Sequence, residues 1–350
     1  MNRIGIVYAL ASAALFGAST PAAKILLGTL DPFVLAGLLY CGAGIGVAAL
    51  RWLAPAVVPR TAVQIALTRE DLPWLAAAIV AGGIAGPLLL MWGLARTDAS
   101  AASLLLALEG AATALIAWLV FHESFDRRIL TGFACLVGGV IILSWSGTPT
   151  LTTVAGPLAI IGACIAWGLD NNLTRKVSLS DPLQIVQLKG LTAGPFNLAL
   201  GFWIATSLSP TPAWLLAGVI GFFGYGISLV LYVVALRHLG AARTGAYFAT
   251  APFVGAVISV VMLGDQITAG LLLAGVLMSI GVWLHVTEHH EHTHAHEITT
   301  HTHPHLHDEH HQHAHGPDDP AGQPHVHPHR QEPLVHTHPH TPDAHHIHRH

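Results

Sequence analysis

The 350-residue sequence is poor in charged residues and in cysteine. Asp, Glu, Lys and Arg together make up 10% of the chain, less than half of the roughly 25% that soluble domains carry. A water-soluble enzyme of this length could not cover its surface with so few charges. The three cysteines, Cys41, Cys135 and Cys164, all lie in apolar runs. The sequence therefore offers neither a disulfide framework nor a CxxC zinc site.

The motifs of nucleotide chemistry and of nucleophilic catalysis are also missing from the sequence. It contains no P-loop, no dinucleotide-binding glycine fingerprint and no pairing of a nucleophile with a base. We therefore expect no enzymatic activity, and ATP-driven transport by this chain is disfavoured. No basic patch with interleaved aromatic residues is present either, so nucleic acid is not an expected partner.

Long apolar runs are abundant instead, and hydrophobic residues make up 53% of the chain. Runs of about 18 or more apolar residues indicate transmembrane helices. The first run resembles a signal peptide, but Lys24 and the nine runs that follow indicate an uncleaved helix. The sequence predicts an all-α polytopic membrane protein with ten transmembrane helices, at residues 4–27, 33–53, 73–95, 99–121, 128–146, 156–175, 182–206, 213–236, 243–263 and 267–286.

The distribution of Lys and Arg predicts the orientation of these helices. With a cytoplasmic N-terminus, ten Lys or Arg residues fall at inner loops and helix ends, and only Lys24 and Arg96 fall at outer ones. Positive residues concentrate on the cytoplasmic side of membrane proteins. We therefore expect a multi-pass protein of the plasma (inner) membrane with both termini in the cytoplasm.

The two halves of the apolar region repeat each other. Phe16-Gly17 followed by Lys24 recurs as Trp167-Gly168 followed by Arg175, at identical spacing, and further pairs recur along the halves. Each repeat holds five helices, an odd number, so the second must enter the membrane inverted. We expect repeats at residues 1–146 and 147–286. Inverted repeats are typical of secondary transporters with a substrate site near the midplane, although a duplication kept only for packing stays an alternative.

Three stretches of the sequence resemble a known family. They are residues 16–24 (FGASTPAAK), residues 99–123, which end in Phe121-His122-Glu123, and residues 241–265 with Pro252. They resemble the drug/metabolite transporter superfamily in its EamA-type branch of ten-helix permeases. The resemblance implies export of a small metabolite. Where that family often has a proline in the fourth helix this chain has Glu109-Gly110, and Tyr40 stands near a position that is often arginine.

Glu109 is the first candidate for the transport pathway. It lies ten residues into its span, about 15 Å along the helix, with no Lys or Arg near it in sequence. A charge at that depth is costly, and removal from water favours the neutral form of a carboxyl group. We therefore expect Glu109 to carry a proton. The alternative is a protonated glutamate that is only hydrogen-bonded to a neighbouring Ser or Thr.

The sixth span contains Trp167 and then three consecutive polar residues, Asp170, Asn171 and Asn172. Successive residues fan around a helix, so these three cannot all face lipid. Asp170 and Lys189 lie at similar depth on adjacent antiparallel helices, which predicts an ion pair. The pair is either structural or a site that opens on binding of substrate or a proton. We assign Lys24 to the pathway as well, although a lysine near a helix end often snorkels.

The C-terminal region differs from the rest, because 23 of the 26 histidines follow Val286. Its low apolar content predicts a disordered tail over residues 287–350. Paired His-x-His units favour binding of Zn, Ni, Co or Cu ions, although incidental binding or pH sensing stays open. The candidate ligands are His290, His292, His294, His296, His301, His303, His305, His307, His311, His313, His315, His325, His327, His329, His336, His338, His340, His346, His348 and His350.

The sequence thus predicts a secondary-active, proton-coupled exporter of a small metabolite, with a cytoplasmic tail that binds transition-metal ions and with no required cofactor. Two alternatives remain. One is an efflux permease for Ni, Co or Zn, and the other is a membrane-anchored metal buffer or sensor. The expected partners are the lipid bilayer, a small-molecule substrate and transition-metal ions. The oligomeric state, a homodimer included, is left open.

Overall fold

The computed structural model describes residues 3–53, 67–121, 127–144, 151–177, 181–205, 212–239 and 241–286, and four further stretches at 290–296, 299–305, 325–331 and 334–340. The first half consists of α1 (Arg3–Leu26), α2 (Pro32–Leu53), α3 (Leu72–Ala78), the π-helix η1 (Ile79–Ala85), α4 (Gly86–Leu94), α5 (Ala99–Leu105), α6 (Leu108–Phe121) and α7 (Arg127–Ser144). The second consists of α8 (Leu151–Lys176), α9 (Pro182–Ile204), α10 (Pro212–Gly221), the π-helix η2 (Phe222–Ile227), α11 (Ser228–Leu239), α12 (Ala241–Phe248), α13 (Ala251–Leu263) and α14 (Ala269–Val286).

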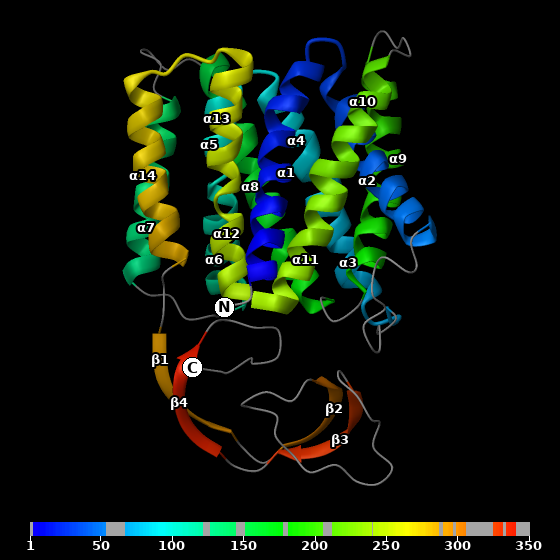
Figure 1. The fold of residues 1–350 in the computed structure, drawn as a ribbon, viewed down its shortest axis with the longest axis vertical. Helices are drawn as coiled ribbons and strands as arrows, with labels where there is room; N and C mark the ends of the chain where they lie inside the picture. Colours follow the sequence, from blue (N-terminus) through cyan, green and yellow to red (C-terminus); the bar gives the residue numbers. More distant parts are fainter. Residues whose placement is uncertain are drawn as a thin grey trace.

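Each of the ten predicted spans corresponds to one helix or to a stack of consecutive helices, so the predicted fold class is confirmed. Among the described residues, six helices are long and apolar enough to cross a membrane, and three shorter apolar helices accompany them. The helices stand side by side in one bundle, and α1 begins at the end where α14 finishes and the tail lies (Figure 1). We call this the tail end and the opposite one the far end.

The inverted repeat is visible in the irregularities of the helices. In the third span of each half a π-helix, η1 or η2, separates two α-helical segments. The fourth span of each half is broken, at residues 106–107 and at residues 249–250. Pro252 lies in the first turn of α13 and accounts for the second break, because proline cannot continue a helical ladder. In the first half the chain turns without proline, and the amide of Ala107 bonds to the carbonyl of Leu104.

Glycine allows the two halves to approach each other closely at matching positions. A Cβ atom added to Gly17 on α1 would lie 2.4 Å from the carbonyl oxygen of Ala251. One added to Gly168 on α8 would lie 2.8 Å from the backbone nitrogen of Thr113. Contacts this short leave no room for a side chain. Each half thus packs the first helix of its repeat against the broken fourth helix of the other.

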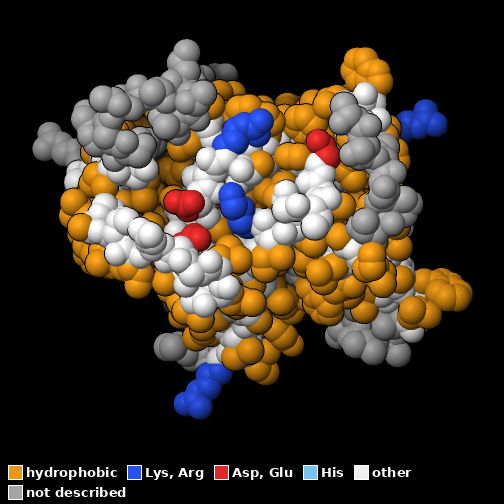
Figure 2. Space-filling view, turned by 90° about the horizontal axis from the view of Figure 1, so that it is seen from above, with side chains coloured by type: hydrophobic (Ala, Val, Ile, Leu, Met, Phe, Trp, Pro, Cys, Tyr) orange, Lys and Arg blue, Asp and Glu red, His pale blue; other side chains and the backbone are white. Residues whose placement is uncertain are grey.

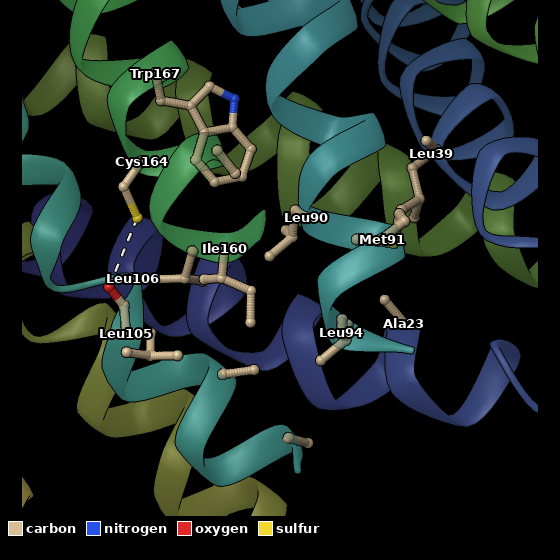
Figure 3. Packing of buried hydrophobic residues seen from close by; sticks show 14 of the residues in the cluster. Ala23, Leu39, Leu90, Met91, Leu94, Leu105, Leu106, Ile160, Cys164 and Trp167 are labelled. Carbon is tan, nitrogen blue, oxygen red and sulfur yellow. Dashed lines mark hydrogen bonds between the residues drawn. The ribbon is translucent and has the colours of Figure 1, made fainter. Parts of the chain in front are cut away.

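The apolar core lies in the half of the bundle toward the far end. Leu39, Leu90, Met91, Leu94 and Ile160 are at most 1% exposed, and Figure 3 shows them packed between α2, α4 and α8. These helices bury Leu, Met and Ile against one another, which fills the centre and excludes water. The polar side chains of the spans therefore gather at mid-depth and toward the tail end.

The structure describes four strands in the tail, and the disorder expected over residues 287–350 stays a prediction. β1 (His290–His296) pairs antiparallel with β4 (Leu334–His340), and β2 (Thr299–His305) pairs antiparallel with β3 (His325–Gln331). Alternation of His with other residues has the period of a strand. Proline is accommodated because both strands of a two-stranded ribbon are edge strands. Six pairs of histidines stand opposite each other: His290–His340, His292–His338, His294–His336, His301–His329, His303–His327 and His305–His325.

Candidate substrate and proton site

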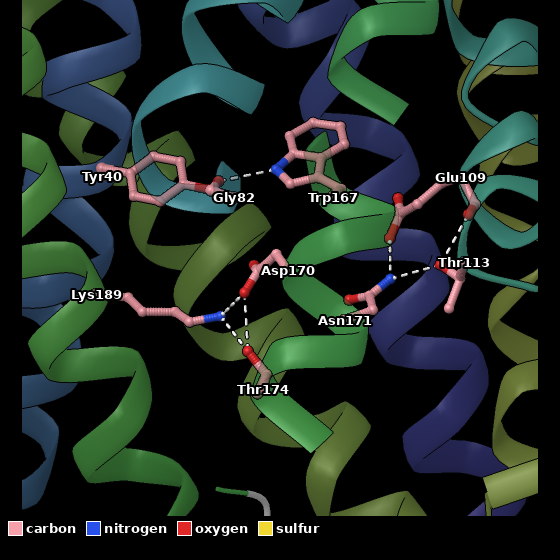
Figure 4. A network of polar contacts seen from close by, with 9 residues as sticks. All are labelled: Tyr40, Gly82, Glu109, Thr113, Trp167, Asp170, Asn171, Thr174 and Lys189. Carbon is pink, nitrogen blue, oxygen red and sulfur yellow. Dashed lines mark hydrogen bonds and ion pairs between the residues drawn. The ribbon is translucent and has the colours of Figure 1, made fainter. Parts of the chain in front are cut away.

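Glu109 lies directly after the break in the fourth span, in the first turn of α6, and its carboxyl group faces α8. The Asn171 side-chain amide donates to Glu109 Oε1 at 3.1 Å and to Thr113 Oγ1 at 3.1 Å. The Thr113 hydroxyl donates to the Glu109 carbonyl at 2.8 Å (Figure 4). Among the described residues Glu109 forms no ion pair. Its carboxyl group thus accepts a hydrogen bond from a neutral amide.

Asp170 and Lys189 form the ion pair that their predicted depths suggested. Lys189 Nζ lies 2.5 Å from Asp170 Oδ1, and the two side chains are only 11% and 13% exposed. Lys189 also donates to Thr174 Oγ1 at 2.8 Å, and the Thr174 hydroxyl donates to Asp170 at 2.8 Å. The pair joins α8 to α9 one residue from Asn171. Because the two charges neutralise each other, the pair has no net charge that could compensate the charge of Glu109.

Asn172 and Trp167 tie α8 to its neighbours. The Asn172 amide donates to the carbonyls of Gly168 and Thr113 at 2.8 and 3.0 Å, which fixes α8 against α6. Trp167 Nε1 donates to the carbonyl of Gly82 at 2.9 Å, and the Tyr40 hydroxyl donates to the same oxygen at 2.7 Å. A π-helix shifts the backbone hydrogen-bond register, and here a carbonyl of η1 accepts two side chains. The predicted pathway residues Trp167, Asp170, Asn171 and Asn172 therefore lie on one stretch of α8 and contact η1, α9 and α6.

The structure adds an aromatic cluster that the sequence analysis missed. Phe16 lies at its centre, with ring centroids 6.3 Å from Trp167, 5.8 Å from Tyr225 and 5.5 Å from Phe248. Tyr40 and Tyr232 extend it through contacts with Tyr225 and Phe248 at 5.6 and 4.9 Å. These rings come from α1, α2, α8, η2, α11 and α12. No spacing within one helix could reveal a cluster to which six helices each contribute a single ring.

Lys24 lies apart from this network, near the far end. Its ammonium group donates to the carbonyls of Leu94 and Thr97 at 2.6 and 2.7 Å, so it binds the last turn of α4. Nearby, Asp265 Oδ2 accepts the backbone N–H of Ser100 at 2.8 Å and caps α5 from the other half of the chain. Figure 2 shows this face, with a few charged side chains in its middle and apolar ones around them. These contacts join α1 to the end of α4, and α5 to the loop before α14, at the far end.

The histidines of the tail are only partly described. Those in β1 to β4 have the register positions given above, whereas His307, His311, His313, His315, His346, His348 and His350 lie outside the described residues. In the part of the chain that the structure describes, no group of three or more His, Cys, Asp or Glu side chains is placed to hold a metal ion. Within the bundle, the Cys164 thiol donates to the carbonyl of Leu105 at 3.6 Å.

Comparisons with known proteins agree with the predicted family and fold. A model of the EamA-like transporter family matches residues 3–145 and again residues 154–287. An uncharacterized transporter of Methanothermobacter thermautotrophicus is 25% identical over 297 residues, which cover 81% of this chain and 87% of that protein. A crystal structure with 17% sequence identity superposes with a TM-score of 0.60 and covers 81% of this chain and 98% of its own. At that identity the superposition bears on the fold alone.

Proposed function

The chain belongs to the EamA-like transporter family, and on that premise we propose that it exports a small metabolite and couples the export to proton movement through Glu109. The observation that carries the proposal is the carboxyl group of Glu109, which lies inside a spanning helix and accepts a hydrogen bond from the neutral amide of Asn171. An unpaired carboxylate in that position is costly. Binding a proton or a substrate relieves the cost, and this makes the two events interdependent.

The access to this carboxyl group supports one direction of opening. Toward the far end the bundle is filled by the apolar core and by the contacts of Lys24. Beside Glu109, in contrast, Asn171 is exposed and a Cβ added to Gly110 would meet no atom within 4 Å. We infer a state that is open from the tail end, which the positive-inside distribution assigns to the cytoplasm. Substrate would enter from there and leave after the far end opens.

The test is transport in proteoliposomes with an imposed proton gradient. Glu109→Gln keeps the shape of the side chain but cannot titrate, so gradient-driven flux should fall about a hundredfold or more, from the lower end of the range for loss of a positioned proton-transfer group. Exchange of substrate across the membrane in the absence of a gradient should survive. The matched control is Glu70→Gln, the same change at an exposed residue outside the spans. Unchanged pH dependence of flux in the Glu109 variant would exclude this assignment.

We also propose that the tail binds transition-metal ions beside the cytoplasmic opening and acts there as a buffer or regulator. The register of the strands supports this, because opposed positions in an antiparallel pair have Cβ atoms about 4.5–5.5 Å apart, close enough for two imidazoles to share one ion. Coordination requires neutral imidazole. Binding should therefore be strong above pH about 6.5 and be lost as the pH falls below it.

Truncation after Val286 tests the role of the tail. We expect the shortened protein to insert into the membrane and to lose most binding of Zn²⁺ and Ni²⁺ in isothermal titration calorimetry. Equal stoichiometry and affinity in the truncated and full chains would rule the tail out as the metal site. The alternative of metal efflux is tested in the same vesicles, because dissipation of a Zn²⁺ or Ni²⁺ gradient by the full chain would make the metal the cargo.

A further inference from the structure

We propose that the site around Glu109 takes an organic ammonium compound, an amine or a quaternary ammonium, held by the Glu109 carboxylate and by the faces of the aromatic cluster. The inference rests on the proposed function, since it assigns the substrate class of the same site. It is carried by the charge balance of the interior, by the arrangement of the rings and by the hydrogen-bonding groups that remain available.

The charge balance of the described interior favours a cation. Asp170 is neutralised by Lys189 at 2.5 Å, and the ammonium group of Lys24 is held by two backbone carbonyls at the far end. Glu109 keeps a carboxylate with only a neutral amide donor. When it is ionised, this part of the molecule carries one uncompensated negative charge. A positively charged ligand satisfies that charge, whereas a carboxylate or phosphate ligand would be repelled by it.

The aromatic cluster supplies the second element of recognition. Trp167 lies four residues before Asn171 on α8, so the indole and the amide that binds Glu109 share one helix face. Phe16, Tyr225 and Phe248 are each partly exposed, and Phe16 contacts the other two rings. A cation over the face of such a ring is attracted by the ring quadrupole, and the attraction grows when water is excluded.

The hydrogen-bonding groups near the site point the same way. The Tyr40 hydroxyl and the Trp167 indole N–H both donate to Gly82, and the Asn172 amide donates to two carbonyls. These donors are therefore unavailable to an anion. Asn171 uses its amide N–H groups toward Glu109 and Thr113, so these donors are not available to an anion either. An amine with N–H groups can donate to the Glu109 carboxylate, and a quaternary ammonium is attracted to it by charge alone.

The first test uses the unaltered protein and three probes that share a phenyl ring and a short chain. These are phenethylammonium, which is a cation, phenylalanine, which is a zwitterion, and 3-phenylpropanoate, which is an anion. Calorimetric titration of the purified full chain at pH 7.5 should give the tightest binding for the cation, and the anion should bind at least about tenfold more weakly. Equal or tighter binding of the anion would overturn the inference, as would absence of measurable cation binding.

The second test assigns the two recognition elements. Glu109→Gln should weaken phenethylammonium binding about tenfold or more and leave 3-phenylpropanoate binding unchanged or stronger. Tyr225→Leu should weaken the cation about threefold to tenfold, whereas Tyr225→Phe should retain it, because the ring face rather than the hydroxyl is used. Trp203→Leu is the control, since that ring is 84% exposed at the end of α9. If Tyr225→Leu and Tyr225→Phe bind the cation equally well, the aromatic ring does not contribute to binding.

The outcomes separate this inference from the proposed function. If Glu109→Gln abolishes proton-driven flux while the anion is the preferred probe, the proton role stands and the ammonium class is wrong. If cations bind as expected while proton-driven flux is unaffected in that variant, the site is correctly assigned and the coupling role is wrong. Elution volume in size-exclusion chromatography and binding of the least affected probe establish that each variant is folded.

Discussion

The two halves of the bundle have the same framework but different chemistry. Both place a π-helix in the third span and a break in the fourth, and both pack a glycine of their first helix, Gly17 or Gly168, against the broken helix of the other half. The aromatic residues before these glycines, Phe16 and Trp167, contact each other across the centre. A framework built twice in opposite directions can open toward either side of the membrane at similar free energy.

The charged residues, in contrast, have no charged counterpart at the corresponding positions of the other half. At the spacing that relates Trp167 to Phe16, Asp170 corresponds to Ser19, and at the spacing of the two Asp-Pro pairs Lys189 corresponds to Leu39. When the breaks at residues 106–107 and 249–250 are aligned, Glu109 corresponds to Pro252. One coupling carboxyl group suffices if it is exposed alternately to the two sides. The comparison thus separates the packing that both halves share from the polar side chains that have no counterpart in the other half.

The largest loss of stability is expected when Asp170 or Lys189 is replaced by the residue that corresponds to it in the first half. Asp170→Ser alone, or Lys189→Leu alone, leaves a buried charge without its partner and should lower the free energy of unfolding by about 3–5 kcal/mol. The double variant should be less damaging than either single change. Chemical denaturation of the purified variants measures this. Arg69→Leu is the control, because it removes the charge of an exposed side chain and should change stability by no more than about 0.5 kcal/mol. Strictly additive losses would argue against coupling of the pair.

The close contacts of glycine should be equally important in both halves. Gly17→Ala and Gly168→Ala each place a methyl group against backbone, which should lower stability by about 1–3 kcal/mol. Gly218→Ala meets no atom within 4 Å and should leave stability unchanged or slightly raise it. Thermal unfolding followed by intrinsic fluorescence tests the three variants together. A tolerant Gly168 beside an intolerant Gly17 would show that the halves are not packed alike.

The cap that Asp265 provides to α5 links the halves at the far end. Asp265→Ala removes the acceptor of the Ser100 N–H, and loss of a helix cap costs about 1 kcal/mol. Asp98 is the N-cap residue of the same helix but makes no capping bond through its side chain, so Asp98→Ala should cost less. Hydrogen exchange of the α5 amides reports the difference. Equal exchange of the α5 amides in the two variants would mean that the Asp265 cap does not stabilise this helix.

The smallest effect is expected at the break in the fourth span, which both halves have although only the second has a proline there. Gly110→Pro introduces a proline into the first turn of α6, one residue after the position that corresponds to Pro252 of α13. Proline is tolerated in the first turn of a helix, and no atom lies within 4 Å of the Cβ position. The change in stability should stay below about 1 kcal/mol, with transport retained, as measured by the melting temperature and by flux. Loss of folded protein would show that the first break requires glycine.

Much of the architecture could be predicted from particular residues. The spans, the inversion and the pairing of Asp170 with Lys189 follow from hydrophobic length, from the odd number of helices per repeat and from equal depth along antiparallel helices. Lys24 shows where such reasoning stops. Its position near a helix end is compatible with snorkelling or with the pathway, yet it binds the carbonyls of Leu94 and Thr97, about seventy residues away in sequence.

The sequence by itself determined which segments cross the membrane and how the two halves are oriented, because the cost of burying polar groups in lipid acts on each segment locally. Only the tertiary structure decided the partners of the polar groups and the composition of the aromatic cluster. Glu109 meets Asn171, and Phe16 meets Trp167, Tyr225 and Phe248, through the packing of separate helices. Such contacts depend on rotation and tilt of whole helices, which apolar periodicity leaves free and side-chain packing fixes.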